Sequence, residues 1–179
     1  IDTLNAPHGR TLDVDLKSKL NRGRRIIVNG MTNNKKPAFS WVKNGEGKDY
    51  DYSQDHLYVK VPSSATNGEL AIVEDTLKPG FFLARHHHKK MTEIFFVVEG
   101  QVQFIFDGKT ITTDKGDTIS VPPNTWHAAK STNGGKMLTI FKNGRFDVYL
   151  ERLSKMTKAD FKNKKLMKRV SHEFDIYNE

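Results

Sequence analysis

The sequence predicts an all-β jelly-roll barrel, preceded by an N-terminal arm that contains strands and followed by helices. One short apolar segment follows another between residues 57 and 141, each bounded by Gly, Pro, Asn or Asp, as in sandwiches and barrels. Asp107-Gly108 separates two such segments and is a strong β-hairpin signal. After Phe141 the apolar residues recur at helical spacing instead.

The predicted barrel occupies residues 56–142 of the 179 residues. Its expected strands are Leu57–Val61, Glu69–Glu74, Phe81–His88, Glu93–Val98, Gln101–Phe106, Lys109–Thr113, Thr118–Val121, Trp126–Lys130 and Lys136–Phe141. Residues 1–55 form the predicted arm, with strands at Arg24–Val28 and Ala38–Val42, and are expected to pack on the barrel or on a partner subunit. The length predicts one globular domain with a single substantial core.

Residues 143–179 form the predicted helical segment. Its first apolar stripe consists of Phe146, Tyr149, Leu150 and Leu153. Thr157-x-x-Asp160 is a capping-box pattern before a second helix, whose stripe consists of Leu166, Met167, Val170 and Phe174. We expect both stripes to pack against the outside of the barrel rather than to contact a ligand.

Three histidines and one glutamate form a candidate metal site. His86 and His88 are two residues apart, so in a strand they face the same way. Glu93 begins the next apolar segment, and His127 follows a Pro-Pro turn. A sheet that folds back on itself brings the four together as ligands for one divalent Fe, Mn, Ni, Cu or Zn ion. His87 points to the other face and is expected to be a surface residue.

The spacing of these residues resembles the two motifs of the cupin superfamily. The first motif is matched at Gly80, His86, His88, Glu93 and Gly100. The second is matched at Gly116, Pro122 and His127. Asn124 stands where the family has glycine and Ser131 where it has asparagine, but neither is a metal ligand. Because Asn tolerates a left-handed backbone better than other non-glycine residues, we expect the turn at Asn124 to be kept.

The resemblance implies a jelly-roll fold and a metal held by His86, His88, Glu93 and His127. The run NGRFDVYLERL at 143–153 is similar to the tail of single-domain flavonol-cleaving cupins, so the chain resembles quercetin dioxygenases in particular. In those enzymes the ligand glutamate is also inferred to remove a proton from the bound hydroxyl. By that resemblance Glu93 is the candidate catalytic base.

Strand alternation also predicts what surrounds the metal. The side chains expected to line a substrate pocket are Phe82, Phe95, Val97, Phe104 and Ala129. Such a pocket is apolar and aromatic, and it fits an organic substrate with one polar end on the metal. No Arg falls in register with the ligands, and Arg85 points away. The pocket is therefore expected to favour an aromatic molecule over a small dianion such as oxalate.

The opposite face of the strand that carries Glu93 is equally apolar. Ile94, Phe96 and Val98 lie on it and must be covered by the second layer of the barrel, the N-terminal strand or a partner subunit. A homodimer is the expected assembly.

These features support three hypotheses about function. The first is a metal-dependent dioxygenase that acts on an enolic or phenolic small molecule. The second is a Lewis-acid isomerase, cyclase or lyase, in which Tyr52, His56 or Tyr58 moves a proton. The third is a non-catalytic cupin that binds a small molecule.

Composition excludes several other classes. There is no cysteine, so a disulfide framework, a Cys-ligated zinc and a thiol nucleophile are all excluded. The net charge of +8 is concentrated in the tail without a nucleic-acid-binding motif, so a solvated helix face is expected rather than a nucleic-acid partner. No apolar stretch reaches membrane-spanning length and no signal peptide is recognised, so we expect no membrane association and a cytoplasmic location.

Overall fold

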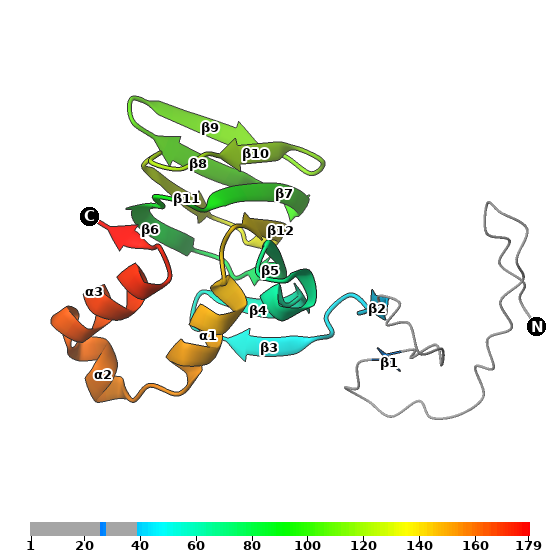
Figure 1. The fold of residues 1–179 in the computed structure, drawn as a ribbon. Coiled ribbons are helices and arrows are strands. Elements are labelled where there is room, and N and C mark those ends of the chain that lie inside the picture. Colours follow the sequence, from blue (N-terminus) through cyan, green and yellow to red (C-terminus); the bar gives the residue numbers. More distant parts are fainter. Residues whose placement is uncertain (1–25, 28–38) are drawn as a thin grey trace, which may run out of the picture.

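The computed structural model of the chain describes residues 26–27 and 39–179. Figure 1 shows two β-sheets packed face to face, with helices against one end of the barrel and the last strand beside it. The strands are β1 (Ile26–Ile27), β2 (Ser40–Trp41), β3 (Lys48–Asp51), β4 (Asp55–Val61), β5 (Leu70–Leu77), β6 (Phe81–His87), β7 (Thr92–Gly100), β8 (Val102–Phe106), β9 (Lys109–Thr113), β10 (Thr118–Val121), β11 (His127–Ser131), β12 (Gly135–Lys142) and β13 (Tyr177–Asn178). The helices are the short 3₁₀ helix η1 (Ser63–Thr66), α1 (Phe146–Ser154), α2 (Lys158–Lys162) and α3 (Lys164–Glu173).

The two barrel sheets are antiparallel throughout. The larger has the order β10-β7-β12-β5-β4-β3, and the smaller has the order β13-β6-β11-β8-β9. The chain crosses between the sheets repeatedly, as in a jelly roll, which confirms the predicted fold class. The larger sheet already begins at β3, within the segment that the sequence assigned to the N-terminal arm.

The barrel core lies between the inner faces of the sheets. Phe95 of β7 and Phe104 of β8 meet there, with their ring centroids 4.9 Å apart. Val97, Val102 and Ala129 are buried around them. Alternation places these residues inside because successive side chains of a strand point to opposite faces.

A β-bulge in β6 interrupts this alternation. His127 of β11 pairs with His86, but Ala129 pairs with Leu83, so β6 has one extra residue between these two positions. A single inserted residue reverses which side chains point inward on one side of the bulge. Before the bulge the odd-numbered residues of β6 face inward, so Phe81 is buried and Phe82 is 52% exposed. After the bulge the even-numbered residues face inward, as His86 does.

The C-terminal segment contains more than helices. α1 begins at Phe146 as the spacing predicted, and Thr157 and Asp160 form the predicted capping box at α2. The expected second helix is divided at Asn163, whose side chain caps α3 by accepting a hydrogen bond from the Leu166 N–H at 3.1 Å. The chain then returns to the barrel, where β13 pairs with the edge of β6.

The outer face of β7 is only partly covered. Phe96 is 39% exposed, and the smaller sheet packs on the opposite face, where Phe95 lies. Of the three covers expected for this outer face, the second layer of the barrel is therefore excluded, and the N-terminal strand and a partner subunit stay predictions. Residues 1–25 and 28–38 of the expected N-terminal arm lie outside the described residues, and the homodimer stays a prediction.

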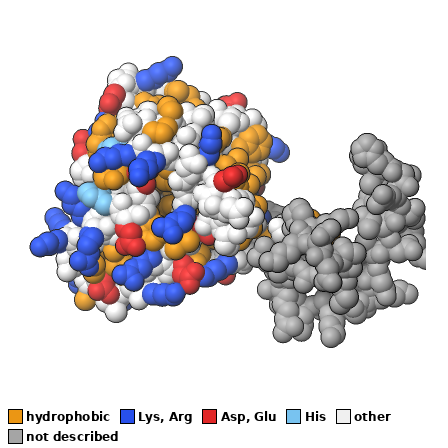
Figure 2. Space-filling model, in the orientation of Figure 1, with side chains coloured by type: hydrophobic (Ala, Val, Ile, Leu, Met, Phe, Trp, Pro, Cys, Tyr) orange, Lys and Arg blue, Asp and Glu red, His pale blue; other side chains and the backbone are white. Residues whose placement is uncertain are grey.

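Charged side chains are mixed over the visible surface. Figure 2 shows Lys and Arg scattered among acidic and apolar side chains on the face that it presents, rather than gathered in one stripe. Within the described segments, no helix combines the length and the apolar character needed to cross a membrane.

Candidate metal centre and its cavity

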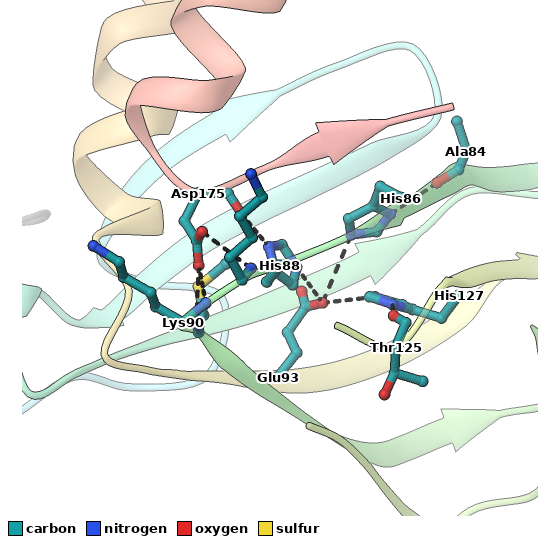
Figure 3. A network of polar contacts seen from close by, with 10 residues as sticks. Ala84, His86, His88, Lys90, Glu93, Thr125, His127 and Asp175 are labelled. Carbon is teal, nitrogen blue, oxygen red and sulfur yellow. Dashed lines mark hydrogen bonds and ion pairs between the residues drawn. The ribbon is translucent and has the colours of Figure 1, made fainter. Parts of the chain in front are cut away.

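Four side chains that are far apart in the sequence meet inside the barrel (Figure 3). The Nε2 atoms of His127, His88 and His86 lie 2.9, 3.1 and 3.7 Å from Oε2 of Glu93. One potential ligand atom from each of the four lies within 4.8 Å of all the others. All four side chains are buried, and His127 is not exposed at all. The structure thus brings together the four residues that the sequence proposed as a set.

Strand register explains this convergence. His86 and His127 are partners in neighbouring strands of the smaller sheet, whereas Glu93 lies in the larger sheet. The cluster therefore bridges the two layers. His88 follows β6 by one residue and faces the same way as His86 because the alternation is intact after the bulge.

The turn at Asn124 holds the loop that leads to His127. Asn124 has the left-handed backbone that the sequence predicted, with φ of 64°. Its N–H donates a hydrogen bond of 2.6 Å to the backbone carbonyl of His88. The two motif segments are thereby joined beside the cluster.

Each imidazole of the cluster also makes a hydrogen bond on its far side. The Nδ1–H groups donate to backbone carbonyl oxygens at 2.8 Å for His86 and Ala84, 3.0 Å for His127 and Thr125, and 2.7 Å for His88 and Asp175. A carbonyl oxygen only accepts hydrogen bonds, so each ring carries a proton on Nδ1, and in the neutral imidazole Nε2 presents its lone pair to the cluster. This is the tautomer that binds a metal.

Glu93 is ionised in these surroundings. Burial opposes its ionisation, but hydrogen bonds from His127, His86 and His88 outweigh burial and hold its pKa well below the usual range. When the imidazoles are neutral, three Nε2 lone pairs and a carboxylate oxygen face one another at short distances. Such groups attract only with a proton or a cation between them, so the donor set fits a divalent transition-metal ion.

Asp175 supports the loop after His88 as well as the imidazole itself. Its carboxylate accepts hydrogen bonds from the backbone N–H groups of Lys89, Lys90 and Met91 at 3.1, 2.8 and 2.8 Å. Burial opposes ionisation of Asp175, but the three N–H groups keep its pKa below the usual range. Asp175, in the C-terminal segment, thus holds the turn between β6 and β7 in place (Figure 3).

A cavity of about 240 Å³ opens beside the cluster, and His86, His88 and Glu93 form part of its wall. The aromatic and polar side chains that line it include Tyr52, Asp75, Phe95, Phe146 and Tyr149. No Lys or Arg is among the described residues of its wall. A larger surface hollow of about 590 Å³, beside β3, β4 and α1, contains none of the four clustered residues.

The comparison with protein families agrees with the geometry. Residues 73–141 are a match to the Cupin domain. This match contains the whole His/Glu cluster. The curated relatives of the chain include the quercetin 2,3-dioxygenase of Bacillus subtilis (strain 168), which is 29% identical over 114 residues. That alignment covers 63% of this chain but only 34% of the relative, so this chain spans about a third of that enzyme's length.

Solved cupin structures share the fold. KdgF from Halomonas sp. superposes with a TM-score of 0.55 at 20% identity, over 62% of this chain and 98% of that one. An RmlC-like cupin from Shewanella frigidimarina gives 0.51 at 22% identity, over 60% and 94%. A predicted oxalate decarboxylase from Thermotoga maritima gives 0.54 at 18% identity, over 57% and 97%. At these identities the likeness shows the fold alone.

Of the residues expected to line the substrate pocket, only Phe95 lies on the cavity wall. Val97, Phe104 and Ala129 are buried in the barrel core instead. Phe82 points to solvent, and this expectation is wrong because the bulge in β6 reverses the alternation that placed Phe82 beside His86. Phe81 and Leu83 occupy the wall in its place.

The expectation for α1 also needs correction. Its stripe was predicted to pack on the outside of the barrel, but Phe146, Tyr149, Leu150 and Leu153 line the cavity. In Figure 1 the helix lies at one end of the barrel, in front of the larger sheet. Helical spacing in a sequence shows which face is buried, but not whether that face meets a core or a cavity.

Only one of the three residues proposed to move a proton lies at the cavity. Tyr52 lines the cavity, but His56 and Tyr58 do not. The imidazole of His56 lies between the Asp49 carboxylate at 2.9 Å and the Tyr58 hydroxyl at 3.1 Å, on the outer face of the sheet. The sequence argument missed Asp75, whose only signal was an acidic residue inside the apolar strand LAIVEDTL.

His87 points away from the cluster as predicted, but it is half-buried rather than a free surface residue. Its ring contacts Trp126 and stacks on Tyr177 of β13, with centroid distances of 4.4 and 5.2 Å. Arg85 also points away from the cluster and lies over the Trp126 ring. This aromatic group fastens β13 to β6.

Proposed function

We propose that this chain is a metal-dependent oxygenase that acts on a neutral enolic or phenolic small molecule. The observation that carries the proposal is the convergence of three Nε2 lone pairs and the ionised Glu93 carboxylate at the wall of an aromatic cavity. The similarity to a quercetin 2,3-dioxygenase supports the reaction class.

The four clustered residues would hold the metal, and their hydrogen bonds determine how. A bound divalent transition metal supplies Lewis acidity to an enolate or phenolate oxygen and, when redox-active, a path for electrons to O₂. His86, His88 and His127 present Nε2 because their Nδ1–H groups are held by backbone carbonyls. This outer set of hydrogen bonds orients the rings before any ligand arrives.

Glu93 has a second task in the proposed reaction. Its Oε2 makes the contacts with the histidines, which leaves Oε1 to accept a proton from the substrate hydroxyl. Phe95, Phe146 and Leu150 line the same cavity, and their apolar side chains would exclude water from a substrate bound there. The absence of Lys and Arg from the described wall favours a neutral substrate over a carboxylate.

Oxygen uptake tests the proposal. Protein loaded separately with Fe, Mn, Ni or Cu should consume O₂ with at least one member of a panel of flavonols, enediols and phenols. Glu93→Gln should abolish this uptake, whereas Glu99→Gln on the same strand changes an exposed carboxylate and should retain it. No uptake with any metal and substrate would contradict the oxygenase assignment.

The same panel separates the alternatives when it is repeated without oxygen. An oxygenase stalls under strict anaerobiosis. Product formation there would identify a Lewis-acid isomerase, cyclase or lyase instead. Binding of the panel without turnover in either condition would identify a non-catalytic binding protein.

A further inference from the structure

A second polar group lies in the cavity, away from the His/Glu cluster. Asp75 lies on the inner face of β5, where its strand partners are Leu57 and Met137. Its side chain belongs to the cavity wall, the residue is only 6% exposed, and Oδ1 has no hydrogen-bond partner among the described residues. A buried carboxyl without a partner is destabilising, and a polar ligand atom would satisfy it.

The surroundings of Asp75 favour the neutral form of its carboxyl, which can donate a hydrogen bond. Burial raises the pKa of Asp75 well above its usual range, and the nearby Asp55 carboxylate raises it further. A protonated carboxyl carries an O–H group that donates to a carbonyl or hydroxyl oxygen. A neutral carboxyl also has no charge, whereas an ionised carboxylate would repel an anionic ligand.

The Tyr52 hydroxyl belongs to the same end of the cavity. It is buried without a hydrogen-bond partner in the described structure, and Tyr52 lines the same wall. Burial raises the pKa of Tyr52 to about 12, and Asp55 contributes to this rise as it does for Asp75. Two unsatisfied donors therefore lie beside one flanking carboxylate.

The distance from this end to the metal cluster indicates the size of the ligand. Asp75 and Glu93 are separated by one strand, β12, and by four residue positions along the sheet, because Met137 pairs with Asp75 and Phe141 with Glu93. At ordinary strand spacings this is about 10 Å across and about 13 Å along the sheet, before the side chains reach inward. A single ring is too short, whereas a two- or three-ring molecule is long enough.

We propose that Asp75 and Tyr52 bind an oxygen at the far end of a neutral, multi-ring substrate whose near oxygen faces the His/Glu cluster, and that this end rejects a carboxylate. The inference rests on the proposed function, which it narrows to one substrate class. A carboxylate at this end would lie beside Asp55 with no described Lys or Arg in the wall to balance it.

Three matched ligands test this inference on Zn²⁺-loaded protein, where no redox turnover interferes. They are 3-hydroxyflavone, which has no polar group at the far end, 3,4′-dihydroxyflavone, which adds a hydroxyl there, and 4′-carboxy-3-hydroxyflavone, which adds a carboxylate. All three share the chelating hydroxyketone, whose absorbance shift on metal binding reports the near end. The 4′-hydroxyl should tighten binding about 3- to 10-fold, as expected of one neutral hydrogen bond, and the carboxylate should weaken it.

Variants assign the preference to Asp75. Asp75→Leu should remove the advantage of the 4′-hydroxyl while leaving the affinity for 3-hydroxyflavone unchanged or better. Asp75→Asn retains a donor and should keep most of the preference, which guards against a misfolded Leu variant. Asp51→Asn removes a nearby exposed carboxylate outside the cavity and should change nothing.

The outcomes separate this inference from the proposed function. A preference that is absent from the wild type, or that survives in Asp75→Leu, would overturn the role of Asp75 while the metal site stands. Failure of all three flavones to bind or to shift in absorbance would overturn the proposed function, and this inference with it.

Discussion

The imidazole Nδ1–H of His88 donates a hydrogen bond of 2.7 Å to the backbone carbonyl of Asp175, which lies 87 residues further along the chain. The other two histidines of the cluster bond to carbonyls only two residues away. His88 is therefore the one member of the cluster whose orientation depends on the C-terminal segment. This dependence makes Asp175 a positioning residue for the metal site.

Replacing Asp175 should weaken both the fold and metal binding. Asp175→Ala leaves three backbone N–H groups without their acceptor and places Ala at φ of 63°. We expect a loss of roughly 2–3 kcal/mol in the free energy of unfolding, measured with urea. Metal affinity should fall about 10-fold or more, because the backbone carbonyl that orients His88 is retained but is no longer anchored by the carboxylate.

Two further variants at this position separate strain from hydrogen bonding. Asp175→Gly accepts the left-handed backbone but lacks the carboxylate, and Asp175→Asn accepts the backbone and keeps one acceptor oxygen. Metal affinity should be highest in Asp175→Asn, lower in Asp175→Gly and lowest in Asp175→Ala. An unchanged affinity in all three variants would limit Asp175 to a role in stability.

The metal content of adjacent histidine variants should differ sharply. His88→Ala removes a ligand and should reduce the bound metal from about one equivalent to a small fraction in elemental analysis. His87→Ala, one residue earlier, removes a ring on the opposite face and should retain the metal while it weakens the contact with β13. Equal metal content in the two variants would contradict the proposed ligand set.

Stability should depend on pH through Asp75. Its folded-state pKa lies above the unfolded value, so the stability associated with the neutral form is fully present below about pH 4 and is lost as pH rises towards the folded-state pKa. Asp75→Asn does not titrate. Its advantage over the wild type in the free energy of unfolding should therefore grow by about 1.4 kcal/mol per pH unit in that window.

Urea unfolding of both proteins from pH 4 to pH 8 checks this. A constant difference between them would show that Asp75 ionises as easily in the folded chain as in the unfolded one. That result would also remove the neutral donor on which far-end recognition depends.

The turn at Asn124 should tolerate glycine but not alanine. Asn124→Gly keeps φ of 64° without strain and should leave stability within a few tenths of a kcal/mol. Asn124→Ala should cost about 1–2 kcal/mol, because a Cβ in the left-handed region meets the following carbonyl and Ala lacks the amide that favours it. Thermal unfolding of the two variants measures the difference, and equal melting temperatures would contradict it.

The sequence was sufficient for the fold class and for the four clustered residues because both depend on local patterns. Short strands, turn residues and alternation are visible in the sequence, and so is the spacing that places His86 beside His88. The left-handed turn at Asn124 was predicted for the same reason.

The walls of the cavity depend on features that leave no such pattern. One inserted residue in β6 reversed the orientation of Phe82, and no residue type in the segment signals the bulge. The place of α1 over the cavity and the carbonyl of Asp175 beside His88 are long-range contacts, which alternation and periodicity do not contain. Asp75 was missed because the side chain of an acidic residue in an apolar strand can point into the barrel or out to solvent, and the sequence does not show which until the strand register is known.

The pairing of β13 with β6 also orders events during synthesis of the chain. β6 and His88 leave the ribosome 87 residues before Asp175, which at about 5–20 residues per second corresponds to roughly 4–17 s. Throughout this interval one edge of β6 has no strand beside it, and His88 has no carbonyl to hold its ring. The His/Glu cluster is therefore complete only after Asp175 has been made and β13 has paired with β6, so we expect a metal to bind after that step.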